Sequence, residues 1–200
     1  MKQADKKMKN QGFVVWFTGL SGSGKTTLAI ELERELQRRN IRVQRLDGDI
    51  VRQSLTKDLG FTEEDRKTNI ERVLFVARLL AKHGIATLVS FISPYISARD
   101  NARKEIQSVG ANFIEVFVKA SVEECARRDV KGLYEKAFAG EIKNFTGVSH
   151  PYEKPPNPEV ICNTECETVS ESTELLLTYL EKQNLIPPYQ EEKLLPKIEK

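Results

Sequence analysis

Residues 19–26, Gly-Leu-Ser-Gly-Ser-Gly-Lys-Thr, match the phosphate-binding pattern GxxxxGK[ST] in full. The glycines allow successive backbone N–H groups to turn towards a polyphosphate, and a helix beginning here adds the partial positive charge of its N-terminus. In such a loop Lys25 reaches the β- and γ-phosphates, and the hydroxyl of Thr26 binds Mg²⁺. A glycine-rich turn without a ligand is the alternative, but the lysine and the hydroxyl in register favour a nucleoside triphosphate site. The residues expected to bind ATP here are Gly19, Ser21, Gly22, Ser23, Gly24, Lys25, Thr26 and Thr27.

Two carboxylates follow the next apolar segment, in Leu-Asp-Gly-Asp at 46–49. In open α/β sheets the ligand lies at the carboxyl ends of the strands, so an acid at this place faces the phosphates. Asp49 is therefore predicted to bind Mg²⁺ together with Thr26, or to accept the proton of an attacking hydroxyl. Its alternative role is the N-cap of a short helix that follows. Asp47 is interpreted as the structural member of the pair.

The spacing of apolar residues predicts the elements that position these side chains. Residues 13–17 form a continuous apolar run, typical of a strand buried on both faces, and from Lys25 the apolar residues recur at helical spacing. Further strands are predicted at 42–46, 86–92, 113–118 and 160–162, and helices after Asp49, after the capping-box sequence 62–65, and at 97–109, 121–129 and 169–182. This alternation predicts an α/β fold with a mostly parallel five-stranded sheet and helices on both faces.

The stretch from 130 to 158 shows no clear periodicity, and so long an irregular segment inside a compact domain is usually a lid or a binding loop. Its basic beginning, 127–131, is expected to close over the γ-phosphate, with Arg127 binding ATP. A solvated helix end is the alternative. The domain is predicted to span 13–183 with its lid at 127–158, between a mobile arm at 1–12 and a tail at 184–200.

Composition narrows the class of protein further. Two hundred residues give one domain, and a net charge of +2 argues against nucleic acid as a partner. No apolar run is long enough for a membrane helix, so no membrane is expected. Three cysteines without CxxC spacing favour free thiols, and the predicted location is the cytoplasm.

Five short strings occur in a fixed order, and together they resemble the adenylyl-sulfate kinase family. They are LDGDxxR at 46–52, DLGFxxxDRxxN at 58–69, FISPY at 91–95, RDxKGLY at 128–134 and FTG at 145–147. The resemblance covers about 13–180 and implies a P-loop kinase fold with a lid segment. It also implies ATP and Mg²⁺ as cofactors and, in sulfate assimilation, phosphorylation of the 3′-hydroxyl of adenosine 5′-phosphosulfate to 3′-phosphoadenosine 5′-phosphosulfate and ADP.

The resemblance also implies where that acceptor nucleotide binds. Its adenine would lie between Phe61 and Phe145, with core packing as the alternative for both rings, and stacking on an aromatic side chain contributes about 1–3 kcal/mol per base. Arginine forks suit sulfate and phosphate oxygens, and Cys166 would border the adenine of ATP. The residues expected to bind the acceptor are Asp49, Arg52, Phe61, Arg66, Asn69, Ile92, Ser93, Lys131, Asn144 and Phe145.

The residues expected to act in catalysis are Lys25, Asp49 and Ser93. The family's serine is described as a phosphoserine intermediate, but the sequence offers no evident base beside Ser93, so direct transfer is predicted. Because Pro94 follows it, Ser93 is expected to be extended. The sequence departs from the family pattern at Ile50, Lys119, Phe138 and Asn144.

Two other functions remain open on the sequence alone. Another small-metabolite kinase, acting on gluconate, shikimate or a nucleotide, would share the phosphate-binding loop, and a non-catalytic nucleotide-binding module would share the fold. The resemblance further implies a homodimer, and an association with ATP sulfurylase is considered.

Overall fold

The computed structural model describes residues 12–60 and 62–188, which form a five-stranded parallel sheet in the order β2-β3-β1-β4-β5. The strands are β1 Phe13–Thr18, β2 Val43–Asp47, β3 Ala86–Ser90, β4 Asn112–Lys119 and β5 Val160–Asn163. The helices are α1 Lys25–Arg38, α2 Gly48–Gln53, α3 Glu63–Lys82, α4 Ile96–Ser108, α5 Val122–Arg128, α6 Leu133–Phe138 and α7 Val169–Lys182. The predicted α/β class and parallel sheet are confirmed.

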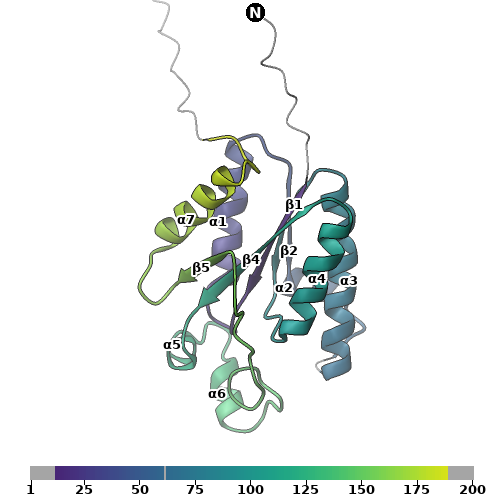
Figure 1. The fold of residues 1–200 in the computed structure, drawn as a ribbon. Coiled ribbons are helices and arrows are strands. Elements are labelled where there is room, and N and C mark those ends of the chain that lie inside the picture. The colour runs from purple at the N-terminus through teal and green to yellow at the C-terminus, as the bar shows by residue number, and fades with distance from the viewer. Residues whose placement is uncertain (1–11, 61, 189–200) are drawn as a thin grey trace, which may run out of the picture.

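Helices cover both faces of the sheet, with α1 and α7 on one face and α3 and α4 on the other (Figure 1). Every residue of β1 is buried. Alternate side chains of this central strand supply the two cores: Phe13, Val15 and Phe17 pack with α1 and α7, and Val14 and Trp16 pack with α3 and α4. A strand buried on both faces must be apolar throughout, which explains why the run at 13–17 shows no alternation.

Two helix starts decide the roles of nearby carboxylates. The capping box predicted at 62–65 is present, because Thr62 and Asp65 each accept a backbone N–H of the other. The N-cap of α2 is Asp47, whose carboxylate accepts the N–H of Asp49 at 3.0 Å. The alternative role of Asp49 as the cap of this helix is therefore wrong.

The expected irregular stretch contains a helix, α6. Gly132 lies before it with φ of 62°, and the carboxylate of Asp129 accepts the N–H groups of Leu133, Tyr134 and Glu135. Six residues are too few to show an apolar period, so periodicity could not predict this helix. The bonds from its first N–H groups to Asp129 stabilise its start.

Both ends of the described chain pack on the domain. Residues 1–11 of the predicted arm and 189–200 of the predicted tail lie outside the described residues. Gly12 is buried, and a Cβ placed on it would lie 2.1 Å from the carbonyl oxygen of Ala81. Ile186 is 2% exposed and belongs to the core that includes Leu180, so core contacts continue beyond residue 183.

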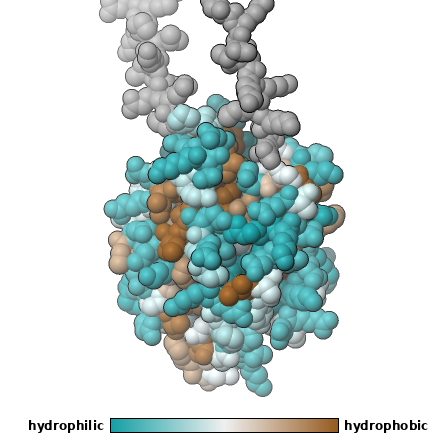
Figure 2. Space-filling model, in the orientation of Figure 1, coloured by the Kyte–Doolittle hydropathy of each residue, from teal (hydrophilic) through white to brown (hydrophobic). Residues whose placement is uncertain are grey.

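The surface carries scattered apolar residues. The face shown in Figure 2 is largely hydrophilic, and its apolar areas are interrupted by polar residues. Among the helices of the described residues, none has the length and apolar character needed to cross a membrane.

Candidate active site

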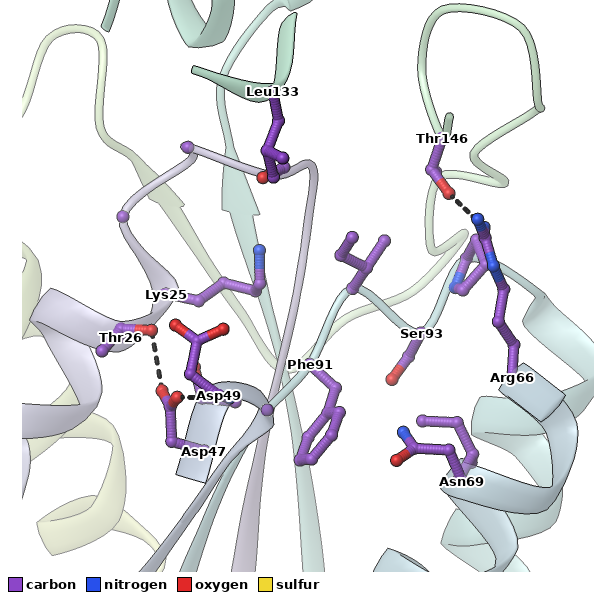
Figure 3. A pocket seen from close by; sticks show the side chains of 18 of the residues that line it. Lys25, Thr26, Asp47, Asp49, Arg66, Asn69, Phe91, Ser93, Leu133 and Thr146 are labelled. Carbon is purple, nitrogen blue, oxygen red and sulfur yellow. Dashed lines mark hydrogen bonds between the residues drawn. The ribbon is translucent and has the colours of Figure 1, made fainter. Parts of the chain in front are cut away.

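A cleft of about 1360 Å³ lies where β1, β2 and β3 end. It is lined by the loop after β1, by α2 and α3, by the loop after β3, by the lid at 127–158 and by the loop after β5. Pockets for one small ligand usually measure about 300–1,000 Å³, so this volume suits two nucleotides. Figure 3 shows Lys25, Thr26, Asp47 and Asp49 on one side of the cleft, and Arg66, Asn69 and Ser93 on the other. We call these sides the P-loop half and the acceptor half.

The P-loop half is built on glycines that no other residue could replace without strain. Gly22 and Gly24 have φ of 76° and 99°, and a Cβ on Gly19 would lie 2.4 Å from the carbonyl oxygen of Val118. The residues of this loop that line the cleft are Ser21, Gly22, Gly24, Lys25, Thr26 and Thr27, whereas Ser23 is fully buried. The loop therefore has the local shape that the sequence predicts.

Lys25 is buried in the loop and points into the cleft. Its ammonium donates to the carbonyl oxygens of Gly19 at 3.0 Å and Leu20 at 2.7 Å. Burial lowers the pKa of Lys25 from 10.5 to about 8, and the nearby charges of Asp47 and Asp49 oppose that shift. Burial costs this ammonium its hydration, and the opposite charge of a phosphate beside it would offset that cost.

Asp47 contributes more to the P-loop half than the sequence indicated. Its carboxylate accepts the hydroxyl of Thr26 at 2.7 Å and also caps α2, and it is only 3% exposed. Asp49 stands further out, with a side chain that is 64% exposed and forms an ion pair with Lys131 of the lid. An acid at the end of a strand beside a phosphate-binding loop is the signal that could have marked Asp47.

These oxygen atoms fit a magnesium ion. Mg²⁺ prefers hard oxygen ligands, and in phosphate-transferring sites it uses one or two carboxylates together with waters and substrate phosphates. Thr26, Asp47 and Asp49 gather one hydroxyl and two carboxylates at the same point of the cleft. Within the described residues, no group of three or more His, Cys, Asp or Glu side chains could hold a metal ion by itself.

Two arginines converge on the acceptor half. Arg66 donates to the hydroxyl of Thr146 at 3.0 Å and to the carbonyl oxygen of Asn144 at 2.8 Å, and Arg52 donates to the carbonyl oxygen of Gly60 at 3.1 Å. The pKa of Arg52 is lowered, first by burial and then by the positive charge of Arg66. Two positive side chains on one wall of the cleft favour the binding of an anion between them.

Asn69 and Phe145 also lie in this half. Asn69 is 4% exposed, and no hydrogen-bond partner of its Oδ1 is found among the described residues. Phe145 lines the cleft but is only 8% exposed, and its ring meets that of Tyr134 edge-on at 4.9 Å. Phe145 is thus both a cleft residue and a packed one, whereas the sequence posed these as alternatives. Phe61, the other predicted ring, lies outside the described residues.

Ser93 does not have the extended conformation expected of a residue before proline. Its φ is 45°, in the left-handed region. Its hydroxyl oxygen accepts the indole N–H of Trp16 at 3.0 Å, and its carbonyl oxygen accepts a guanidinium N–H of Arg99 at 2.6 Å. These buried bonds hold a conformation that the local preference of an X-Pro sequence opposes, so the expectation of an extended residue is wrong. Ile92 and Ser93 both line the cleft.

The lid contacts the P-loop half through residues other than the one expected. Arg127 pairs with Glu124 on its own helix, its side chain is 73% exposed, and it is not among the residues that line the cleft. Arg128 instead donates to the carbonyl oxygens of Gly22 and Thr164, and the hydroxyl of Tyr134 donates to the carbonyl oxygen of Ser21 at 2.9 Å.

The remaining expected positions lie at the margin. Cys166 is exposed and does not line the cleft, whereas its neighbours Thr164 and Glu167 do. The departures from the family pattern, Ile50, Lys119, Phe138 and Asn144, are likewise not cleft-lining residues. Two of them bond to cleft-lining residues through their carbonyl oxygens: Asn144 accepts from Arg66, and Lys119 accepts from Thr164.

Comparison with known proteins agrees with this geometry. The family model described as "Adenylylsulphate kinase" matches residues 11–163. An adenylyl-sulfate kinase of Halothermothrix orenii is 59% identical over 180 residues, which are 90% of this chain and 95% of the relative. A probable bifunctional SAT/APS kinase of Sorangium cellulosum is 51% identical over 176 residues, 88% of this chain but 30% of that longer protein.

Among solved structures, the APS kinase of Mycobacterium tuberculosis in complex with AMPPNP and APS superposes with a TM-score of 0.82 at 44% identity. The match covers 86% of this chain and 98% of the other. A family model that spans most of the chain, a relative of this similarity and the same fold lead to one conclusion. The chain belongs to the adenylylsulphate kinase family.

Proposed function

We infer that this protein is an ATP-dependent adenylyl-sulfate kinase, which phosphorylates the 3′-hydroxyl of adenosine 5′-phosphosulfate (APS) in sulfate assimilation. The observation that carries the inference is one cleft with two unlike halves. A phosphate-binding loop forms one half, and Arg52, Arg66 and Asn69 form the other. A transfer between two polar ligands uses both halves of the cleft. Family membership identifies the second ligand as a sulfonucleotide.

We propose that the P-loop half binds ATP through Lys25 and the backbone N–H groups of its loop. Thr26, Asp47 and Asp49 would hold Mg²⁺, which when bound neutralises negative charge on the phosphates. Lys25 stabilises charge on the transferred group and Arg128 fixes the loop, because it binds the carbonyl oxygen of Gly22. The bond between Arg128 and Thr164 ties the same loop to the strand edge at β5.

We propose that the acceptor half orients APS for in-line attack. Arg52 and Arg66 bind its anionic end, Asn69 accepts a hydrogen bond, and Phe145 offers a ring to the adenine. The 3′-oxygen forms a bond to the γ-phosphorus while the bond from that phosphorus to the β-phosphate oxygen breaks. Asp49 accepts the proton of the 3′-hydroxyl, and ADP and the 3′-phosphorylated nucleotide are released. Lys131, paired with Asp49, brings a positive charge to the same point.

A coupled assay of ADP release tests this function. We expect turnover with APS and Mg-ATP, and no more than background with gluconate, shikimate or AMP. Lys25→Ala, which removes the ammonium facing the transferred group, should abolish it. Turnover of one of the other acceptors in preference to APS would establish another small-metabolite kinase. ATP binding without any turnover would establish a non-catalytic module.

We also propose an assembly and a location for the protein. A homodimer is implied by the family resemblance, and sedimentation equilibrium tests it. Association with an ATP sulfurylase is supported by the bifunctional relative, and co-purification with that enzyme tests it. Location in the cytoplasm stays a prediction from the cysteine content and the lack of a long apolar run.

A further inference from the structure

A buried polar network lies beneath the acceptor half, centred on Arg99 of α4. Arg99 is 2% exposed, and its guanidinium makes three hydrogen bonds. Nε donates to the carboxylate of Glu115 at 2.6 Å, one terminal nitrogen donates to the carbonyl oxygen of Ser93 at 2.6 Å, and the other donates to the carbonyl oxygen of Glu153 at 2.8 Å. No sequence motif pointed to this residue.

Charge balance alone does not explain this arrangement. An arginine removed from water is tolerated only when its charge is paired, and Glu115, itself 6% exposed, supplies that pairing. The two carbonyl oxygens are neutral, so the bonds to them do not compensate the charge of Arg99. They instead hold the main chain at Ser93 and Glu153 in place. They join main-chain segments that are far apart in the sequence, one in the loop after β3 and the other at the end of the lid.

The first of these segments needs an external constraint. Ser93 has φ of 45°, a conformation that a non-glycine residue keeps only where its surroundings impose it. Arg99 holds its carbonyl oxygen, and Trp16 of β1 holds its hydroxyl oxygen. The indole donates that bond, so the hydroxyl hydrogen of Ser93 stays available as a donor towards the cleft.

The second segment is fastened to the same loop by further bonds. The N–H of Glu153 donates to the carbonyl oxygen of Pro94 at 2.9 Å, and the carboxylate of Glu153 accepts the N–H of Ile96 at 2.7 Å. The hydroxyl of Tyr152 bonds that of Thr18, which donates to the carbonyl oxygen of Ile92 at 2.7 Å. The end of the lid and the loop after β3 thus form one unit, with Arg99 beneath it.

We propose that Arg99 is a positioning residue for the acceptor half: its buried guanidinium fixes the main chain at Ser93 in the left-handed conformation and locks it to the main chain at Glu153. The inference rests on the proposed function, since its effect is measured on APS. Ser93 lies beside Arg66 and Asn69, away from Lys25 and Thr26 (Figure 3). Loss of the anchor therefore weakens acceptor binding and transfer and spares the binding of ATP.

The test compares Arg99→Lys with Arg103→Lys. Lysine keeps the charge that faces Glu115 but loses the planar fork that reaches both carbonyl oxygens. Arg103 is the matched control, because it lies one turn further along α4 and belongs to the same network. Its guanidinium bonds to Glu115, to Glu159 and to the carbonyl oxygen of Phe113, and not to the Ser93 loop. We expect Arg99→Lys to lower kcat/KM for APS at least about tenfold, with ATP-analogue affinity within about twofold of wild type. Arg103→Lys should leave both values near wild type.

Amide hydrogen exchange gives a second readout that does not depend on turnover. Peptides that cover 91–96 and those that cover 150–155 should both exchange faster in Arg99→Lys, and neither should change in Arg103→Lys. Trp16→Phe removes the bond to the Ser93 hydroxyl together with part of a fully buried ring, so its melting temperature is measured as well. It should reproduce the APS-specific loss in part, which keeps the test decisive if Arg99→Lys does not fold.

The outcomes separate the inference from the proposed function. If the wild-type protein does not phosphorylate APS, the function is wrong. If it does, and the two lysine variants lose activity equally or ATP binding falls together with APS binding, Arg99 is a general structural residue and the inference is overturned. Wild-type kinetics and wild-type exchange in Arg99→Lys would overturn it as well.

Discussion

At the scale of single residues, the cleft combines a buried ammonium with carboxylates of unequal exposure. Lys25 is 8% exposed and Asp47 3% exposed, whereas the side chain of Asp49 is 64% exposed. The buried pair of groups fixes the geometry of the phosphate-binding loop, because Lys25 and Asp47 both bond to parts of it. The exposed carboxylate is the one that can move to meet a substrate hydroxyl.

The lowered pKa of Lys25 predicts how nucleotide affinity changes with pH. Burial lowers the pKa to about 8 in the free protein, and bound phosphates raise it again because opposite charge favours the ammonium. Binding therefore takes up a proton above about pH 8, and the dissociation constant of an ATP analogue should rise by up to about tenfold per pH unit there. Below that pH, Lys25 is charged in both states and the affinity should be constant. Titration calorimetry checks this, and Lys25→Arg, which is always charged, should remove the proton uptake.

Asp49→Asn separates a chemical role from a structural one. Because Asp47 caps α2, the change should leave stability nearly unaltered, with at most about 1 kcal/mol lost from the exposed pair with Lys131. We expect kcat to fall at least about a hundredfold, since the amide neither accepts the proton nor carries the charge. Melting and steady-state kinetics measure both. A variant with a lowered melting temperature and an unchanged kcat would show that Asp49 has a structural role.

Ser93 distinguishes direct transfer from a covalent intermediate. Its hydroxyl oxygen accepts a bond from Trp16, and among the described residues no histidine or carboxylate bonds to this hydroxyl to remove its proton. Incubation with γ-labelled ATP and no acceptor should therefore leave the protein unlabelled. Stoichiometric label on Ser93, discharged by APS at the rate of turnover, would show a phosphoserine pathway.

At the scale of elements, the lid forms a small core of its own against the P-loop. Leu20, Cys125, Tyr134, Ala137 and Phe145 are buried together, and the hydroxyl of Tyr134 bonds to the carbonyl oxygen of Ser21. The loop that carries Phe145 is thereby packed on the glycine-rich loop after β1. A change in this cluster reaches both halves of the cleft.

Phe145 shows how to separate stacking from packing. Phe145→Ala removes both, so it should cost about 3–5 kcal/mol of folding stability and weaken both ligands. Phe145→Leu keeps most of the apolar volume, and it should leave the melting temperature and ATP affinity near wild type while costing about 1–3 kcal/mol of APS binding. Separate dissociation constants for APS and for an ATP analogue measure this. Equal weakening of the two ligands by Phe145→Leu would exclude the stacking role.

At the scale of the whole molecule, one sheet edge collects the parts of the site. The P-loop follows β1, Asp47 ends β2, Ser93 follows β3 and the lid follows β4, and β1 lies between β3 and β4. Parallel strands bring their carboxyl ends to the same edge, so residues from four separate parts of the chain meet there. The described chain begins and ends at the opposite edge of the sheet, away from the cleft (Figure 1).

The extent of the folded domain gives a prediction at this scale. Compared with a chain that ends at residue 188, one that ends at 183 loses Ile186 from the core and the bond between Arg39 and the carbonyl oxygen of Pro187. We expect the shorter chain to lose about 2–5 kcal/mol, the usual cost of emptying a buried isoleucine site. Urea unfolding measures it, with Ile186→Ala in the full chain as the control. Identical unfolding of the two shortened chains would mean that the domain ends at 183.

The sequence by itself determined the features that are local along the chain. The GxxxxGK[ST] pattern, the apolar run of β1 and the capping box of α3 each depend on neighbouring residues, so spacing alone predicted them. The five strings at 46–147 identified the family, because each places its characteristic side chains within a few residues of one another. Helix boundaries came within a few residues for the same reason, and the short α6 escaped because it lacks a period.

Only the tertiary structure decided which groups act together. Asp47 was interpreted as structural, yet the structure places its carboxylate on the hydroxyl of Thr26 in the phosphate-binding loop. Arg128, and not Arg127, reaches that loop. The left-handed Ser93 depends on Trp16 and Arg99, which lie in other elements. Such contacts join residues that are distant in sequence, and their strength comes from burial and geometry that no local pattern encodes. The backbone preference of a residue before proline disfavours the conformation of Ser93, and buried hydrogen bonds stabilise that conformation nevertheless.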